Sequence, residues 1–215
     1  MAAAALMLAG CPAFCPKGAT EHGAKPPKGQ QRWCTAPGPK GQPVKVGPHE
    51  VWWDNGRLKL EEHYRAGKLD GLQTVFHENG RRFTESHFKG GLQDGTFTQW
   101  TERGQLFRKG AYAKGKRTGH WTTFHLDGTK ATEGDYRGDV KDGRFVVYRQ
   151  DGVPLKAMIY RKGVLEGPYV LWYRNGSKQE QGTYHRGVRD GVVQTWDRLG
   201  KPTGKVTWRH GHKVR

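Results

Sequence analysis

The sequence predicts an all-β fold, an open, elongated antiparallel β-meander solenoid of seven 24-residue β-hairpin repeats. Glycine recurs every 24 residues from Gly47 to Gly191, and aromatic residues recur at two fixed distances after each glycine. Asn-Gly and Asp-Gly pairs separate segments rich in Val, Thr, Phe and Tyr. Such segments favour strands, and the pairs favour tight turns between them. We therefore expect many short strands joined by tight turns.

We number each repeat from its first glycine, which is position 0. The position 0 residues are Gly47, Gly71, Gly95, Gly119, Gly143, Gly167 and Gly191. Aromatic residues at position 5 are Trp52, Phe76, Trp100, Phe124, Tyr148, Trp172 and Trp196. The glycines at position 9 are Gly56, Gly80, Gly104, Gly128, Gly152, Gly176 and Gly200. Aromatic residues at position 17 are Tyr64, Phe88, Tyr112, Tyr136, Tyr160, Tyr184 and Trp208.

Each repeat is predicted to be one hairpin, with the position 9 glycine in its turn at positive φ. The flanking segments, such as TVFHENGRRFTESHF (74–88), are rich in strand-forming residues. A unit this small cannot bury its aromatic residues alone, so neighbouring repeats must stack. We expect ladders of rings at positions 5 and 17, and glycines that leave room for a ring from the next repeat.

An exit turn follows the position 17 aromatic residue and leads to the next repeat. Acidic residues precede the next glycine in five repeats: Asp70, Asp94, Asp142, Glu166 and Asp190. Because this acid recurs, we interpret it as a turn-capping group that accepts backbone N–H bonds. Basic residues at position 18 form a possible binding stripe: Arg65, Lys89, Arg137, Arg161 and Arg209. The stripe could meet anionic lipid, acidic protein or another polyanion, or it could only keep an exposed edge charged against aggregation.

The repeat resembles the bacterial variant of the MORN repeat family. The segments GTFTQWTERGQLFRKGAYAKGKRTG (95–119) and GPYVLWYRNGSKQEQGTYHRGVRDG (167–191) carry this resemblance, which extends from Gly47 to the C-terminus. Relatives with this variant are often labelled YwqK-type antitoxins, and other MORN proteins are membrane-associated scaffolds. The resemblance is specific for the fold, whereas function has to be argued from the site.

The first 46 residues lack the repeat. Residues 11–46 are rich in proline and basic residues, so we expect a solvated tether. Residues 1–10 are apolar and are interpreted as a signal-peptide-like segment. Leu8-Ala9-Gly10-Cys11 resembles the bacterial lipobox, which implies cleavage before Cys11 and a lipid on that cysteine. The alternative is an Ala-rich cytosolic leader with an incidental cysteine.

Three cysteines are present in the chain. If Cys11 carries a lipid, Cys15 and Cys34 remain as a pair. A disulfide between them would close a proline-rich loop, which suits a protein outside the cytoplasm. Two free thiols in a tether are the alternative. A metal site at these cysteines is disfavoured because no C-x-x-C spacing is present.

No motif for catalysis is found. Neither serine, Ser86 or Ser177, lies in a G-x-S-x-G elbow, and no phosphate loop or HExxH motif is present. The scattered histidines are interpreted as partners of the stacked rings. We therefore expect no enzyme activity, no cofactor and no metal.

The expected function is a monomeric, lipid-anchored scaffold of the bacterial cell envelope that binds a protein or an anionic partner. The formal net charge is +17, which favours a polyanionic partner. Nucleic acid is an unlikely partner because an envelope lipoprotein would not meet it. The alternative is a cytosolic, antitoxin-like protein that neutralises a toxin by binding it.

Overall fold

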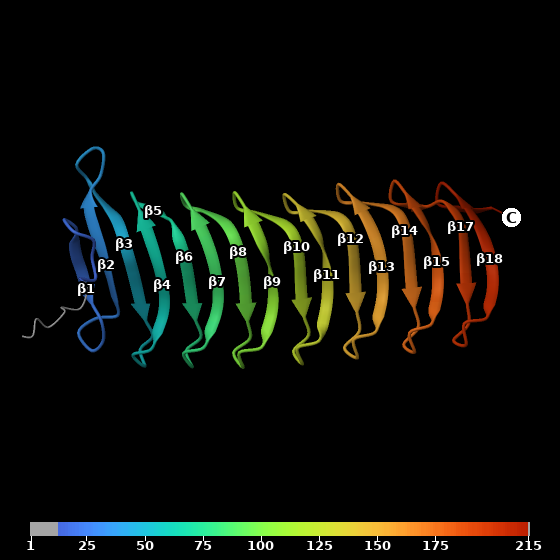
Figure 1. Ribbon diagram of the computed structural model, residues 1–215, viewed down its shortest axis with the longest axis horizontal. Coiled ribbons are helices and arrows are strands. Elements are labelled where there is room, and N and C mark those ends of the chain that lie inside the picture. Colours follow the sequence, from blue (N-terminus) through green and yellow to red (C-terminus); the bar gives the residue numbers. More distant parts are fainter. Residues whose placement is uncertain (1–12, 215) are drawn as a thin grey trace, which may run out of the picture.

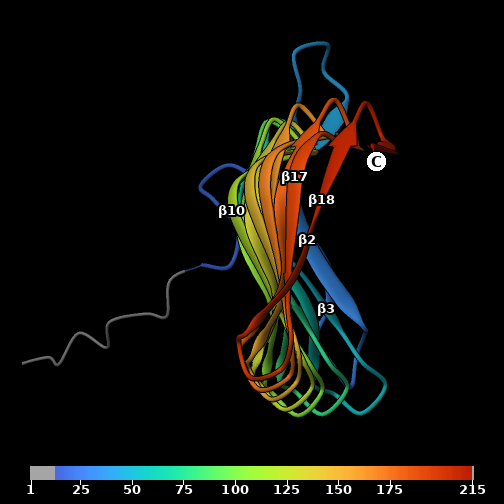
Figure 2. The ribbon, with the colours of Figure 1, turned by 90° about the vertical axis from the view of Figure 1, so that its right-hand side faces the viewer.

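The computed structural model describes residues 13–214, which form one open antiparallel sheet of 19 strands (Figure 1). Successive strands pair with each other, so the sheet is a meander. The strands stand side by side in one elongated row, and they lie behind one another in the end-on view of Figure 2. Residues 13–214 contain no helix, and the predicted all-β fold is confirmed.

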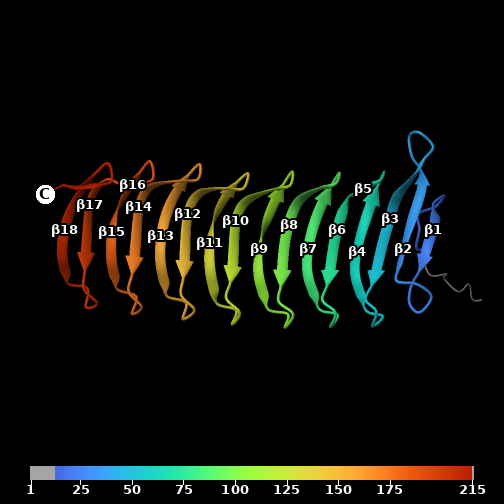
Figure 3. The same cartoon turned by 180° about the vertical axis from the view of Figure 1, so that it is seen from behind.

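The strands follow the 24-residue period from β3 onward. Their bounds are β1 (Thr20–Ala24), β2 (Gln31–Pro37), β3 (Pro43–Trp52), β4 (Leu58–Arg65), β5 (Lys68–Leu69), β6 (Gly71–Phe76), β7 (Arg82–Lys89), β8 (Leu92–Trp100), β9 (Leu106–Ala113), β10 (Lys116–Phe124), β11 (Lys130–Arg137), β12 (Val140–Tyr148), β13 (Pro154–Arg161), β14 (Val164–Trp172), β15 (Lys178–His185), β16 (Val188–Arg189), β17 (Gly191–Trp196), β18 (Pro202–Arg209) and β19 (His212–Val214). The view from behind in Figure 3 shows the same regular row, with β1 and β18 near its two ends.

The seven predicted hairpins are present, and each has a turn at positions 6–10. In the first repeat, the Trp53 N–H donates to the Arg57 carbonyl (2.8 Å) and the Gly56 N–H donates to the Trp53 carbonyl (2.9 Å). The position 9 glycines all have φ between 80° and 88°. This left-handed conformation is costly for a residue with a Cβ, and it explains why glycine recurs there.

The exit turns are tighter than the hairpin turns. Arg65 pairs with Lys68 across the two residues Ala66 and Gly67, which have φ of 48° and 78°. Two successive residues at positive φ are the pattern of a type I′ turn, whose twist matches that of the flanking strands. Positions 19 and 20 have positive φ in all seven repeats.

The prediction of a solvated tether is wrong for residues 13–46. β1 pairs with β2, and β2 pairs with β3, so this part of the chain extends the sheet by two strands. Proline and glycine lie mainly in the connections here, and the disulfide between Cys15 and Cys34 joins the segment before β1 to β2. Composition alone indicated a linker because these strands lack the 24-residue period.

The core is a ladder of rings on one face of the sheet, which we call the ring face. It alternates rings from position 2 of one repeat with rings from position 17. Ring centroids lie 5.7 Å apart between Phe97 and Tyr112, 5.1 Å between Tyr112 and Trp121, and 6.4 Å both between Trp121 and Tyr136 and between Tyr136 and Phe145. Most of these pairs meet edge to face, a favourable geometry for aromatic rings.

Glycines at position 15 let these rings lie flat on the backbone. A Cβ added at any of these glycines would run into the ring of Trp121, Phe145 or Tyr169. The glycines concerned are Gly110, Gly134 and Gly182. The predicted use of glycine to leave room for a ring is thus confirmed, at a position that the sequence had not singled out.

The prediction of a ring ladder at position 5 is wrong, whereas the prediction of one at position 17 is confirmed. Side chains alternate along a strand, so position 5 points to the face opposite the ring face. There, Tyr148 donates its hydroxyl hydrogen bond to Glu133 Oε1 (2.5 Å) and Lys178 lies 5.7 Å from the Trp196 ring. Sequence reasoning missed position 2 because its residues vary from His49 to Val193.

Basic side chains at position 22 cover the ring ladder. Lys141 Nζ lies 3.8 Å from the centroid of Phe145 and 4.9 Å from that of Tyr160. Arg117 lies 4.3 Å from the Tyr136 ring in the same way. Burial lowers the pKa of Lys141, and the neighbouring charges of Lys156 and Arg117 lower this pKa further. These half-buried cations therefore form a cover over the ring ladder.

Candidate functional site

The exit turns form one long edge of the sheet, the upper edge in Figure 1. We call positions 18–21 of all seven repeats the exit-turn edge. Every repeat contributes at least one exposed basic residue, and the only acid at these positions is Asp139. The exposed basic residues of the edge are Arg65, Lys68, Lys89, Lys114, Lys116, Arg137, Arg161, Lys162, Arg186 and Arg209. The five residues of the predicted basic stripe all lie on this edge.

Most of these cations have no acidic partner. Arg65 pairs with Asp70 (3.4 Å), and Arg137 pairs with Asp142 (3.0 Å). The other eight have no carboxylate within ion-pair distance among residues 13–214. The exit-turn edge is therefore a row of largely uncompensated positive charge.

Four of the five acids before the position 0 glycines have the predicted capping role, and each of these four caps the exit turn of the next repeat. The fifth, Asp190, instead lies 4.0 Å from His210 Nε2. The Gly90 N–H donates to Asp70 Oδ2 (3.1 Å), and the Lys162 N–H donates to Asp142 Oδ1 (3.2 Å). Glu166 Oε2 accepts from the Arg186 N–H (2.8 Å), and this bond lowers the pKa of Glu166, with a smaller effect from His185. These carboxylates tie neighbouring turns together, and two of them, Asp70 and Asp142, also pair with Arg65 and Arg137.

Aliphatic side chains lie among the cations at position 21. Each packs over the glycine of the following exit turn. For example, Val140 Cγ1 lies 3.0 Å from the point that a Cβ would occupy if Gly163 had one. Leu92, Val140, Val164 and Val188 remain 42–52% exposed. The edge thus combines positive charge with small apolar tips, a combination that suits the boundary between headgroups and acyl chains.

The hairpin turns form the opposite long edge, which we call the hairpin-turn edge. A side chain at position 6 donates to the position 5 carbonyl of the next repeat in five repeats. Trp53 Nε1 donates to the Phe76 carbonyl (3.3 Å), and Arg149 Nη2 donates to the Trp172 carbonyl (2.9 Å). In the last repeat Asp197 instead accepts from two N–H groups of its own turn, which closes the ladder. This edge is therefore fixed by hydrogen bonds between repeats.

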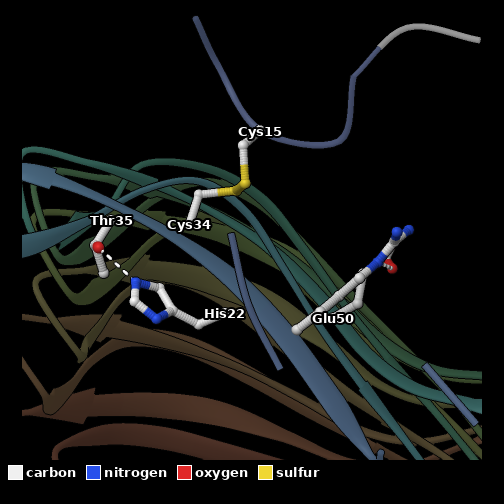
Figure 4. Close-up of a disulfide and its surroundings, with 6 residues drawn as sticks. Cys15, His22, Cys34, Thr35 and Glu50 are labelled. Carbon is white, nitrogen blue, oxygen red and sulfur yellow. Dashed lines mark hydrogen bonds and ion pairs between the residues drawn. A yellow bond between two sulfur atoms is a disulfide. The ribbon is translucent and has the colours of Figure 1, made fainter. Parts of the chain in front are cut away.

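Cys15 and Cys34 form a disulfide with their Cα atoms 5.6 Å apart (Figure 4). Cys34 is fully buried on β2, and beside it His22 forms a hydrogen bond to Thr35 Oγ1 (2.7 Å). The disulfide and the Arg32–Glu50 ion pair (2.7 Å) fix the N-terminal end of the sheet. Residues 1–10 and Cys11, the expected signal segment and lipid site, lie outside the described residues.

A buried polar cluster replaces the rings in the first two repeats. Glu62 accepts hydrogen bonds from His49 Nδ1 (2.8 Å), the Tyr64 hydroxyl (2.9 Å) and Gln73 Nε2 (2.6 Å). Burial acts to raise the pKa of Glu62, but the three hydrogen bonds outweigh it and hold this pKa below its ordinary value. Burial and the bond to Glu62 raise the pKa of Tyr64 to about 12. Of these residues, sequence reasoning had placed only Tyr64 in the core.

Across residues 13–214, no three His, Cys, Asp or Glu side chains come together as a metal site would require. In the same range no helix is long and apolar enough to cross a membrane.

The family model of the MORN repeat variant matches residues 165–186. This segment spans the hairpin of β14 and β15, from the end of one exit turn into the next. The match supports a MORN-repeat protein, and it agrees with the resemblance noted in the sequence. No curated protein matches the chain.

Proposed function

We propose that this protein is a non-catalytic scaffold, anchored in the bacterial envelope through a lipid on Cys11, that binds an anionic partner along its exit-turn edge. The observation that carries the proposal is the row of exposed cations on that edge. MORN repeats suggest a repeat-based binding scaffold, and every repeat of this chain places at least one exposed basic residue on this edge.

The spacing of the cations suits an extended anionic partner. Each repeat adds two strands, so neighbouring exit turns lie roughly 10 Å apart along the sheet. This distance is close to the Debye length of about 8 Å at physiological salt, so neighbouring turns act on a partner almost independently. A basic residue near an anionic membrane surface contributes about 1 kcal/mol. Several turns together would therefore bind, although one turn alone would not.

Two features support the location outside the cytoplasm. Leu8-Ala9-Gly10-Cys11 resembles a lipobox, and the Cys15–Cys34 disulfide is of a kind that persists in oxidising compartments. A lipid at Cys11 would lie only a few residues from the disulfide-fixed end of the sheet. Such an anchor would bring the array close to a surface rich in anionic headgroups.

The binding part of the proposal is tested by neutralising cations on one edge at a time. The exit-turn variant carries Lys89→Gln, Arg161→Gln, Lys162→Gln and Arg186→Gln. The matched control removes the same charge from the hairpin-turn edge and carries Arg57→Gln, Arg81→Gln, Arg103→Gln and Lys201→Gln. Both are made with Cys11→Ser, and binding to vesicles of anionic or neutral lipid is measured by co-sedimentation.

We expect the exit-turn variant to bind anionic vesicles at least tenfold more weakly, whereas the control keeps most of its affinity. Neutral vesicles should bind neither protein. Equal weakening in both variants would mean that net charge alone attracts the protein, and the exit-turn edge would lose its assigned role.

The anchoring part is tested separately by fractionation and mass spectrometry of the protein from its own cells. Wild-type protein should be recovered with membranes and begin at a lipidated Cys11, and Cys11→Ser should move to the soluble fraction. If the wild type keeps residues 1–10 and is fully soluble, the cytosolic, partner-neutralising alternative replaces the lipoprotein.

A further inference from the structure

A cavity lies on the hairpin-turn edge, away from the exit-turn edge. It has a volume of about 580 Å³ and is lined by Arg149, Tyr173, Arg174, Asn175 and Arg198. Three guanidinium groups from three successive repeats thus line one hollow. A volume of this size is within the range of small-molecule sites, and it is much larger than a single inorganic anion needs.

The three arginines differ in how they are held. Arg149 is fixed in place because its Nη1 donates to the Pro154 carbonyl (3.0 Å) and its Nη2 donates to the Trp172 carbonyl (2.9 Å). Arg174 uses its Nε for Asp151 (3.0 Å), which leaves its two terminal nitrogens available. These bonds hold two positive charges at the wall of the hollow before any ligand arrives.

Arg198 is the arginine of the cavity whose guanidinium makes no hydrogen bond within residues 13–214. Its guanidinium lies 6.0 Å from the Tyr173 ring, and no acceptor within residues 13–214 binds its nitrogen atoms. The Tyr173 hydroxyl is occupied by the Trp196 carbonyl (3.0 Å), and the Asn175 amide nitrogen is occupied by the Arg198 carbonyl (2.6 Å). The wall is therefore rigid, and the free donors are those of Arg174 and Arg198.

The excess of positive charge in the cavity is local to the last repeats. Position 7 is acidic in the first three repeats and is occupied by arginine in the last two. The position 7 residues are Asp54, Glu78, Glu102, Leu126, Gln150, Arg174 and Arg198. Asp151 pairs with Arg174, and Asp197 accepts hydrogen bonds from the backbone of its own turn. Neither carboxylate therefore forms an ion pair with the Arg198 guanidinium.

We propose that this cavity binds a phosphorylated small molecule, with Arg174 and Arg198 on the phosphate and Tyr173 beside the rest of the ligand. Guanidinium groups match phosphate geometry through paired N–H donors, and an aromatic ring offers an apolar contact for a sugar or a base. The cavity suits a small, soluble ligand, whereas the exit-turn edge suits an extended partner. The proposal is independent of the proposed membrane anchor and of the exit-turn edge.

The test is isothermal titration calorimetry on the full chain carrying Cys11→Ser, with inorganic phosphate, glucose phosphate and adenosine monophosphate as probes. Arg198→Gln removes the free guanidinium without removing any hydrogen bond described for the fold. Arg103→Gln is the matched control, because it removes one exposed arginine from the same edge outside the cavity.

We expect one site, with a phosphate ester bound more tightly than inorganic phosphate. Arg198→Gln should weaken the ester by about tenfold, the effect of losing one charge-assisted hydrogen bond. Arg103→Gln should change the affinity less than twofold, and anionic vesicles should bind Arg198→Gln as well as the parent protein. No measurable heat with any of the three probes, or the same loss in both variants, would overturn the proposal.

Discussion

At the scale of single residues, the stability of the sheet depends on how the position 2 side chain packs on the residue at position 15. Where position 15 is glycine, a ring lies on the bare backbone, as Phe145 does on Gly134. In the first repeat the same position holds Glu62, and His49 replaces the position 2 ring. One backbone geometry thus accepts either an aromatic contact or a hydrogen-bonded polar pair, although His49 Nε2 is buried without a hydrogen-bond partner among residues 13–214.

Replacing Gly134 by Ala should destabilise the sheet by about 1–3 kcal/mol, because the new Cβ would collide with the Phe145 ring. Urea denaturation of the two proteins measures this loss. Gly204→Ala is the control, because a Cβ there would come no closer than 3.6 Å to Thr195. A control that loses as much stability as Gly134→Ala would show that the ring contact is not the cause.

Replacing Glu62 by Gln should cost about 1–3 kcal/mol at neutral pH, because the amide has no charge and only one acceptor oxygen for the three donors that the carboxylate serves with two. Denaturation at pH 7 measures this loss, and Glu102→Gln, an exposed acid, is the matched control. A Glu62→Gln protein as stable as the wild type would contradict the role of the carboxylate.

The same carboxylate predicts a pH dependence. The pKa of Glu62 in the folded chain lies below the ordinary 4.5 that applies when the chain is unfolded. The unfolded state therefore binds the proton more readily, so the contribution of Glu62 is complete above that value and is lost as pH falls through the folded pKa. Between neutral pH and pH 3, the wild type should lose more stability than Glu62→Gln, and a constant difference would contradict the hydrogen-bonded carboxylate.

At the scale of elements, each hairpin has two kinds of turn, and each turn is joined to its neighbour. The hairpin turn needs one glycine at positive φ, and the exit turn needs two successive residues at positive φ. Position 6 side chains link hairpin turns in five repeats, and four of the acids before the position 0 glycines link neighbouring exit turns. The repeats are therefore held together at both edges as well as through the ring face.

Gly176→Val should destabilise its hairpin by about 1 kcal/mol or more, because a β-branched residue tolerates the φ of 83° poorly. No side chain lies within 4 Å of the new Cβ, so the effect would come from the backbone alone. Thermal unfolding measures it, with Gln179→Val on the following strand as control. An unchanged melting temperature would contradict the assigned turn.

Removing the disulfide should loosen the N-terminal end and leave the later repeats intact. We expect the double variant Cys15→Ser and Cys34→Ser to show faster amide hydrogen exchange in residues 20–52, because loss of a native disulfide commonly costs 2–5 kcal/mol. Residues 140–200 should exchange as before, since they lie several strands away. Unchanged exchange in both regions would show that β1 and β2 need no covalent support.

The repeat period predicted most of the fold, because glycine positions 0 and 9 and the aromatic position 17 hardly vary. Three parts could not be found in this way. Position 2 varies from His49 to Val193, so its part in the core appears only when neighbouring strands are paired. β1 and β2 lie outside the period, and their composition is that of a linker. The cavity needs Arg149, Arg174 and Arg198 from three repeats, and their proximity depends on the register of the sheet.

At the scale of the whole molecule, the sheet is a single elongated row with two long edges of different chemistry (Figure 1). The exit-turn edge has at least one exposed basic residue in every repeat, whereas the hairpin-turn edge changes from acidic residues in the first repeats to arginine in the last two at position 7. At the C-terminal end of the described sheet, Pro202 and Lys205 lie on the part of β18 that does not pair with β19, and such residues discourage pairing with another strand.

The most direct test of this account is to find which edge a bound anionic surface covers. A fluorophore is attached to Ala113→Cys on the exit-turn edge or to Leu126→Cys on the hairpin-turn edge, in protein carrying Cys11→Ser; both sites are exposed and uncharged. Anionic vesicles should shield the label at residue 113 from a soluble quencher and leave the label at residue 126 accessible. Equal shielding of both labels, or shielding of residue 126 alone, would contradict the assignment of the exit-turn edge as the binding surface.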